Sequence, residues 1–232
     1  MCGITGMLNY DQSPINKDIL LNMNDAMTLR GPDDSGHYID NNFGMAMRRL
    51  SIIDLAGGHQ PISNEDGTIH VILNGEIYNY IELRKNLEKK GHQFTTHSDT
   101  EVLVHLYEEY GTDSVHHLNG MFAFAIWDSP RKRVWIVRDR LGIKPLVYFE
   151  SSHGFVFASD LIALARHPDF KTDIDMDSLL LFFTLAYIPT PRTIWNNAKK
   201  LPPGHWILIE NNHLRIEKYW ELLPKIQTNC DK

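Results

Sequence analysis

Met1-Cys2-Gly3-Ile4-Thr5-Gly6 opens the chain and places a cysteine directly behind a methionine that is readily removed before a small residue. Removal of Met1 would leave Cys2 with a thiol and a free α-amine, a group that titrates at roughly 7.7–8.0. Such a residue supplies a nucleophile and a base together, as N-terminal threonine nucleophiles do. The alternative is a cysteine that merely begins a strand, and the remaining sequence must distinguish the two.

Short motifs with distinctive residues follow along almost the whole chain. In order, they are Arg30-Gly31-Pro32-Asp33-Asp34-Ser35-Gly36, Arg49-Leu50-Ser51-Ile52-Ile53-Asp54, Leu73-Asn74-Gly75-Glu76-Ile77-Tyr78-Asn79, Ser98-Asp99-Thr100-Glu101, Arg138-Asp139-Arg140-Leu141-Gly142-Ile143-Lys144-Pro145-Leu146, Tyr187-Ile188-Pro189-Thr190-Pro191-Arg192-Thr193-Ile194 and Leu201-Pro202-Pro203-Gly204-His205. Each motif alone is weak evidence. The ordered set, together with the opening cysteine, resembles the N-terminal glutaminase domain of the glutamine-hydrolysing asparagine synthetases.

The resemblance implies the four-layer αββα sandwich of the N-terminal-nucleophile hydrolases. Hydrophobic periodicity by itself predicts only an α+β fold. We expect the glutaminase domain to span residues 2–174. Residues 175–232 are expected to form a C-terminal extension towards an ATP-dependent synthetase domain. The Ser-Gly-Gly-x-Asp-Ser pyrophosphate loop of that second domain does not occur in the sequence.

Length and composition limit the class of protein. The 232 residues suit one large domain or two small ones, and 43% hydrophobic with 22% charged residues is ordinary for a globular protein. A net charge of −6 argues against nucleic acid or an acidic membrane surface as a partner. The most apolar run, residues 179–188, has about half the length needed to cross a bilayer, which favours a buried or interface helix.

The cysteine content and the first residues predict a cellular compartment. Cys2 and Cys230 are too few for a disulfide framework, and a bond between them would disable the proposed nucleophile. The first ten residues lack the basic and apolar regions of a signal peptide. Both observations predict a reducing, cytoplasmic compartment.

Two helices are predicted between the motifs by their apolar spacing. One spans residues 80–90, and the other spans residues 99–110 with Ser98 and Glu101 as its capping box. Three apolar residues of the first helix are expected to face inward: Ile81, Leu83 and Leu87.

Amide hydrolysis by a thiol needs donors that stabilise the oxyanion. With Cys2 as the nucleophile, the resemblance assigns this role to the side-chain amide of Asn74 and the backbone N–H of Gly75. Two fixed donors facing a tetrahedral intermediate stabilise its charge by several kcal/mol. The residues alone support a competing interpretation, because Asn-Gly after the strand predicted over residues 68–73 is a strong hairpin-turn signal.

Glutamine carries a carboxylate and an ammonium on its α-carbon, so its site needs a cation and an anion. The resemblance gives the carboxylate to the Arg49 guanidinium, whose fork suits it, and the ammonium to Asp99 assisted by Glu76. It also places main-chain groups of four residues in the pocket: Leu50, Ser51, Ile52 and Ile53. In the plainer alternatives, Arg49 is a surface strand residue and Asp99 stabilises the first turn of a helix.

No metal and no cofactor are expected for glutamine hydrolysis itself, because the twelve histidines show no spacing typical of metal ligands. ATP and Mg²⁺ are expected only with the synthetase domain. The expected partners are L-glutamine and that domain, or a separate synthetase chain. The apolar run at residues 179–188 also allows a homodimer.

Two other functions stay open at this point. The chain could be a non-catalytic glutamine-binding or regulatory module that keeps the pocket without useful turnover. It could also serve an amidotransferase with another ammonia acceptor, because acceptor choice lies in the synthetase domain. Cys2 disfavours the second option, since relatives that no longer use glutamine often lose this cysteine.

Overall fold

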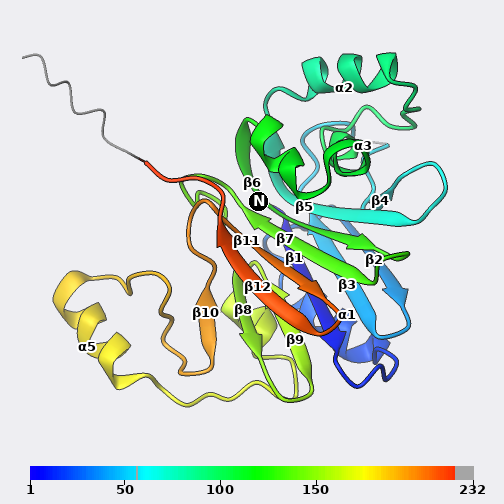
Figure 1. The fold of residues 1–232 in the computed structure, drawn as a ribbon. Helices are drawn as coiled ribbons and strands as arrows, with labels where there is room; N and C mark the ends of the chain where they lie inside the picture. Colours follow the sequence, from blue (N-terminus) through cyan, green and yellow to red (C-terminus); the bar gives the residue numbers. More distant parts are fainter. Residues whose placement is uncertain (56, 223–232) are drawn as a thin grey trace, which may run out of the picture.

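Two six-stranded antiparallel sheets form the centre of the structure, a computed structural model that describes residues 1–55 and 57–222 (Figure 1). The first sheet has the order β10-β8-β9-β1-β3-β2. Its strands are β1 (Gly3–Asn9), β2 (Asp34–Asp40), β3 (Phe43–Arg49), β8 (Val147–Glu150), β9 (Gly154–Ala158) and β10 (Ala198–Lys200). The second sheet has the order β12-β11-β7-β6-β5-β4. Its strands are β4 (Ile62–Ser63), β5 (Ile69–Ile77), β6 (Gly120–Asp128), β7 (Arg133–Arg138), β11 (His205–Glu210) and β12 (His213–Lys218).

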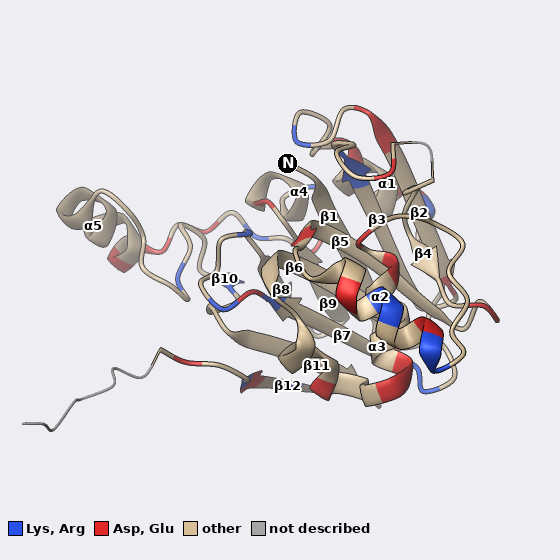
Figure 2. Cartoon of the chain, turned by 90° about the horizontal axis from the view of Figure 1, so that it is seen from above, with Lys and Arg blue, Asp and Glu red and all other residues tan. Residues whose placement is uncertain are grey.

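Helices cover the outer face of each sheet. Their bounds are α1 (Lys17–Asp25), α2 (Tyr80–Lys89), α3 (Glu101–Tyr110), the 3₁₀ helix η1 (Gly111–His117), α4 (Leu161–Leu164) and α5 (Met176–Leu185). α1 and α4 pack on the first sheet, whereas α2 and α3 pack on the second (Figure 1). The expected four-layer αββα order is therefore confirmed. Both signs of charge alternate along the exposed side of α2 (Figure 2), as expected for a solvated helix face.

Period-two alternation on the central strands builds three apolar layers. On β6, one set of side chains faces the helices of the second sheet: Phe122, Phe124 and Ile126. The alternate set faces the first sheet: Ala123, Ala125 and Trp127. Burying one large apolar side chain contributes about 1.5–3 kcal/mol. The layer between the sheets holds the start of β1 in place, which fixes the position of Cys2.

The turn predicted at Asn74-Gly75 is wrong. β5 continues through both residues to Ile77, and its pairing with β6 includes Asn74 opposite Ala123 and Gly75 opposite Phe122. Local turn propensity is overridden because β6 offers a partner along the full length of β5.

Two helix details also differ from the predictions. Ile81 is 55% exposed, although Leu83 and Leu87 are buried as expected. The predicted capping box is wrong, since the Glu101 carboxylate accepts hydrogen bonds from the backbone of Thr95 and Thr96 instead. The Glu101 carboxylate therefore binds the loop before α3 and does not form the capping contact with Ser98.

Strands from both sides of the predicted domain boundary at residue 175 pair within the same two sheets. β10 extends the first sheet, and β11 and β12 complete one edge of the second. The part of this segment that stands away from the sheets is α5, which projects from the body in Figure 1. Of the helices in the described residues, none is long and apolar enough to cross a membrane.

Candidate active site

A cavity of about 90 Å³ lies where the start of β1 meets β5 and the loop after β3. Among the predicted site residues, the structure brings nine to its wall: Cys2, Arg49, Leu50, Ile52, Ile53, Asn74, Gly75, Glu76 and Asp99. Ser51 does not line the cavity, and its backbone N–H donates to Asp33 Oδ2 at 2.8 Å. The cavity therefore unites segments that are distant in sequence.

The Cys2 thiol is free and partly buried at this wall. The backbone N–H of Leu50 donates to its Sγ at 3.4 Å, and Sγ lies 3.7 Å from the Leu50 carbonyl oxygen. Arg30 Nε donates to the Cys2 carbonyl at 3.2 Å. These contacts fix the thiol against the cavity. Cys230 lies outside the described residues.

The alternation of N–H directions along β5 makes the backbone N–H of Gly75 face the cavity. On the same edge of β5, the Leu73 N–H donates to Gln60 Oε1 at 2.7 Å, and the Ile77 N–H donates to Asp99 Oδ2 at 2.9 Å. Successive N–H groups of a strand point to opposite edges, so the Gly75 N–H lies between these two.

Only glycine fits at position 75. A Cβ there would come within 2.3 Å of the Met121 carbonyl oxygen. The strand pairing that sets the direction of the N–H thus also excludes a side chain.

The Asn74 side chain lies fully buried on the inner face of β5. Its Nδ2 is 3.4 Å from Ser159 Oγ, and its Oδ1 has no hydrogen-bond partner among the described residues. Ser159 Oγ accepts from the Ile4 N–H at 3.0 Å, which leaves the hydroxyl hydrogen free to donate. A half-turn of the amide would place Oδ1 on that hydroxyl and Nδ2 at the end that now has no partner; the two ends have the same shape.

The Arg49 guanidinium organises the loop that follows β3. Its Nη2 donates to the carbonyl oxygens of Ile53 at 2.7 Å and Asp54 at 2.8 Å. Asp54 in turn accepts from the backbone N–H of His97 at 2.8 Å. Arg49 has five N–H donors in a planar fork, so donors beyond those on the loop stay available to a carboxylate.

Asp99 supplies buried negative charge, with 5% of its surface exposed. Burial raises its pKa above the usual carboxyl range, and the nearby negative charge of Glu76 adds to the rise. Hydrogen bonds from the backbone N–H of Ile77 and from the Ser98 hydroxyl act in the opposite direction without cancelling the rise. A carboxylate in this state favours a ligand that brings its own positive charge.

Lys144 and Gln60 line the cavity as well, and neither was predicted from the sequence to have a role. The Asp139 carboxylate accepts hydrogen bonds from four backbone N–H groups. Three of them belong to the turn that follows, including that of Lys144 at 3.0 Å, so a tight turn places Lys144 at the cavity. Lys144 belongs to the motif from Arg138 to Leu146, and this was the one feature of the sequence that could have indicated a place at the site. Lys144 and Arg49 balance Glu76 and Asp99, and this equal charge suits a zwitterion.

Comparisons with known proteins identify the family of the chain. The family model described as "Glutamine amidotransferase domain" matches residues 1–220. The chain is 40% identical to asparagine synthetase [glutamine-hydrolyzing] 3 of Bacillus subtilis (strain 168), over 99% of this chain and 38% of that protein. It is 44% identical to asparagine synthetase [glutamine-hydrolyzing] 3 of Arabidopsis thaliana, over 71% of this chain and 28% of that protein.

Solved structures show the same fold at low sequence identity. Glutamine phosphoribosylpyrophosphate amidotransferase from B. subtilis matches 96% of this chain and 50% of its own, with a TM-score of 0.68 and 19% identity. A glutamine aminotransferase class-II domain protein from Silicibacter pomeroyi matches 94% of this chain with a TM-score of 0.52 and 12% identity.

The family match and the fold shared with these structures define a glutamine amidotransferase domain. The chain belongs to the glutamine amidotransferase domain family. It spans less than half of the length of the curated relatives it matches, between 31% and 48% for four of them.

Proposed function

We propose that the chain hydrolyses L-glutamine to L-glutamate and ammonia through a γ-glutamyl thioester on Cys2. With Met1 removed, the α-amine of Cys2 takes the thiol proton, and the thiolate attacks the side-chain amide carbon of glutamine. The C–N bond breaks as ammonia leaves with that proton. Water then cleaves the C–S bond and releases glutamate, so water is the one co-reactant.

The convergence of a thiol with two amide donors in one cavity carries this proposal. Gly75 offers a backbone N–H on the cavity edge of β5, and Asn74 offers a buried amide beside it. Fixed donors at the position of a developing oxyanion are usually the largest single contribution to such catalysis.

The α-carboxylate and the α-ammonium of glutamine each have a side chain of opposite charge on the cavity wall. We assign the α-carboxylate to Arg49 and the α-ammonium to Asp99 and Glu76, with the main chain of Leu50 and Ile53 beside them. Ser51 and Ile52 stay predictions as ligands, the first away from the cavity wall and the second on it.

The direct test is glutamate release by purified protein, with loss of Met1 verified by intact mass. We expect turnover from protein that lacks Met1 and none from protein that retains it. A non-catalytic glutamine-binding module would instead bind glutamine without releasing glutamate, even when correctly processed.

We further propose that the ammonia serves asparagine formation, because the matched relatives are named asparagine synthetases. ATP and Mg²⁺ would act in a synthetase part, supplied in the same polypeptide or as a separate chain. A cytoplasmic location is part of the proposal, since a reducing compartment keeps the Cys2 thiol free.

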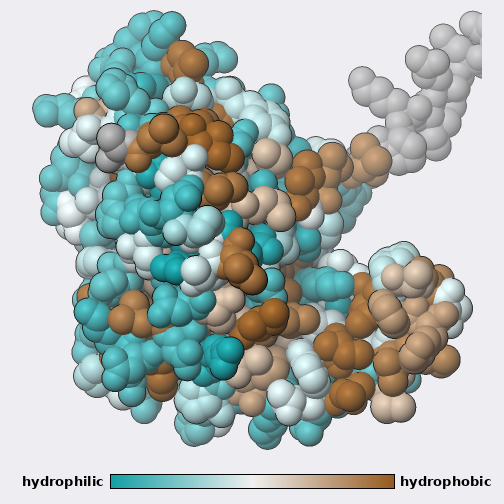
Figure 3. Space-filling view, turned by 180° about the vertical axis from the view of Figure 1, so that it is seen from behind, coloured by the Kyte–Doolittle hydropathy of each residue, from teal (hydrophilic) through white to brown (hydrophobic). Residues whose placement is uncertain are grey.

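Within this proposal, the segment around α5 contacts the synthetase part. α5 buries only Ser178, and several large apolar side chains lie exposed on or beside it: Met176, Leu180, Phe182, Phe183, Leu185 and Tyr187. Figure 3 shows hydrophobic residues gathered on the projecting lobe. A contiguous apolar face of this kind is typical of an interaction surface.

Without a partner on α5, we expect the chain to self-associate as its concentration rises. Leu180 is 67% exposed and Phe183 is 77% exposed, so Leu180→Glu with Phe183→Glu should yield a monomer in sedimentation velocity. Thr172→Glu changes an exposed polar residue outside α5 and should associate like the wild type, which makes it the control. A wild-type protein that stays monomeric at high concentration contradicts the prediction.

Glutamine binding should weaken as the pH falls towards the raised pKa of Asp99. Burial makes this carboxyl take up a proton at a higher pH than an exposed one, and the neutral form no longer attracts an ammonium. We expect KM to rise on the acid side, and Asp99→Asn to raise KM by roughly 10–100-fold and flatten that rise. The exposed Asp113→Asn is the control. An unchanged acid limb of KM in Asp99→Asn would refute the assignment.

A further inference from the structure

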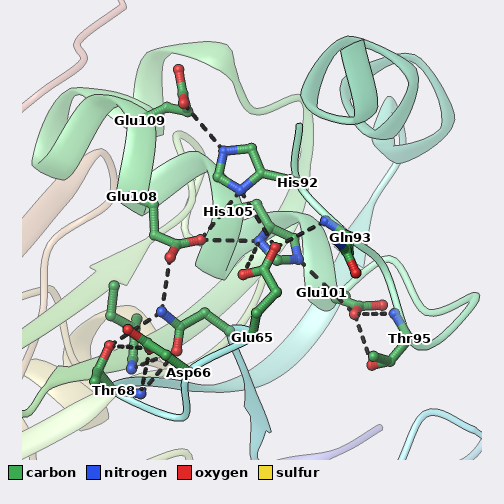
Figure 4. A network of polar contacts seen from close by, with 12 residues as sticks. Glu65, Asp66, Thr68, His92, Gln93, Thr95, Glu101, His105, Glu108 and Glu109 are labelled. Carbon is green, nitrogen blue, oxygen red and sulfur yellow. Dashed lines mark hydrogen bonds and ion pairs between the residues drawn. The ribbon is translucent and has the colours of Figure 1, made fainter. Parts of the chain in front are cut away.

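A second cluster of ligating side chains lies beside α3, which covers the second sheet (Figure 4). None of its residues lines the cavity. Glu65 comes from the turn between β4 and β5, His92 from the loop after α2, and His105 and Glu108 from one face of α3. We propose that these four residues, the His–Glu cluster, bind a divalent transition-metal ion of the zinc class. The expectation of no metal rested on spacing along the sequence, and the fold brings distant segments together.

The spacing of the donor atoms suits four-coordinate zinc. Tetrahedral ligands at 2.0–2.1 Å from an ion lie about 3.3 Å from one another. His105 Nδ1 lies 3.0 Å from Glu108 Oε2 and 3.6 Å from Glu65 Oε2. His92 Nδ1 lies 3.4 Å from Glu108 Oε2 and 3.9 Å from Glu65 Oε1. One donor atom from each residue falls within 4.8 Å of all the others, so small rotamer shifts complete the geometry.

The outer nitrogen of His92 contacts a carboxylate at hydrogen-bond distance, the arrangement that orients metal-bound histidines. A carboxylate also lies near the outer nitrogen of His105, beyond hydrogen-bond distance. His92 Nε2 lies 3.2 Å from Glu109 Oε1, and His105 Nε2 lies 4.0 Å from Glu101 Oε1. His105 is 1% exposed, and its Nε2 has no hydrogen-bond partner among the described residues. An ion on Nδ1 fixes the proton on Nε2, the nitrogen that lies nearer the Glu101 carboxylate.

The charges of the cluster also call for a cation. The ion pairs recorded for Glu65 and Glu108 in the described residues are all with the two histidines. The nearby Lys90 ammonium contacts Glu109 instead. With neutral imidazoles, two carboxylates therefore share the site without a fixed positive charge. The competing account is a metal-free network in which protonated histidines pair with these carboxylates.

The donor set selects the class of ion. Two imidazole nitrogens with two carboxylates suit zinc, cobalt or nickel, whereas calcium and magnesium prefer all-oxygen ligands. Glu65 and Glu108 are exposed, which gives an ion access from solvent. An ion here would tie the β4–β5 turn and the loop after α2 to α3.

The test is calorimetric titration of the chelator-treated full chain with zinc chloride in the presence of millimolar magnesium. We expect one equivalent bound and, at zinc about 100-fold above Kd, a rise in Tm of roughly 5–10 °C. His92→Gln and Glu65→Gln should weaken binding by about 100-fold or more. Glu109→Gln, which touches the imidazole and not the ion, should weaken it by about 10–100-fold.

Two controls separate this site from other zinc ligands. His213→Gln changes an exposed histidine on β12, and Cys2→Ala removes the thiol; both should bind zinc as the wild type does. Cobalt bound in place of zinc should give the strong visible absorption of a four-coordinate ion, and His92→Gln should abolish it. Wild-type protein that binds no equivalent of zinc would overturn the proposal. Zinc binding that survives His92→Gln and Glu65→Gln but is lost in Cys2→Ala would overturn it as well.

Discussion

Replacement of Cys2 by alanine is expected to lower kcat for glutamine hydrolysis by about 10⁴-fold or more. The thiol is the proposed nucleophile, so without it the oxyanion donors have no covalent intermediate to stabilise. The variant should still bind glutamine, because the groups assigned to the zwitterion are untouched. Glutamate release by coupled assay and glutamine binding by calorimetry measure the two effects separately.

Cys2→Ser is the matched control for this prediction. It preserves the size and hydrogen-bonding capacity of the residue but offers a weaker nucleophile, so its activity should also be low while its glutamine affinity stays close to that of the wild type. If Cys2→Ala kept more than a tenth of wild-type turnover, the thioester route would be refuted.

Replacement of Asn74 by alanine is expected to lower kcat by about 10²–10³-fold with little change in KM, because the amide acts on the oxyanion and not on the bound substrate. The fold should lose little stability, since Asn74 Oδ1 has no hydrogen-bond partner in the described structure and Nδ2 makes only one long contact. Steady-state kinetics and thermal unfolding of the same preparations measure both quantities.

Ser159 provides the matched test of how the Asn74 amide is held. Ser159→Ala should lower kcat by about 10-fold on its own and add almost nothing in the Asn74→Ala background, because its effect passes through that amide. Additive losses in the double variant would mean that Ser159 acts independently. An Asn74→Ala protein with wild-type kcat would remove Asn74 from the oxyanion site.

The order of motifs in the sequence predicted the layered fold and most of the cavity wall. Local propensity failed at Asn74-Gly75, where a turn signal lies inside a strand, because the pairing partner β6 is some fifty residues away in the chain. A residue pair with high turn propensity can thus lie inside a strand when long-range pairing fixes the backbone.

Long-range geometry explains the residues that sequence reasoning missed. Lys144 reaches the cavity through the turn organised by Asp139. His92 and His105 meet Glu65 only because α3 packs beside the β4–β5 turn, and no spacing along the chain records that contact. The order of the motifs predicted most of the segments that line the cavity, whereas these positions depend on packing.

Intact mass of acid-quenched protein during turnover tests the central claim most directly. With saturating glutamine, we predict a fraction of Met1-free chains that carry one glutamyl group, located on the Cys2 peptide after digestion and absent from Cys2→Ala. Glutamate release at the wild-type rate with no adduct on Cys2, or with the adduct on another residue, would contradict the account.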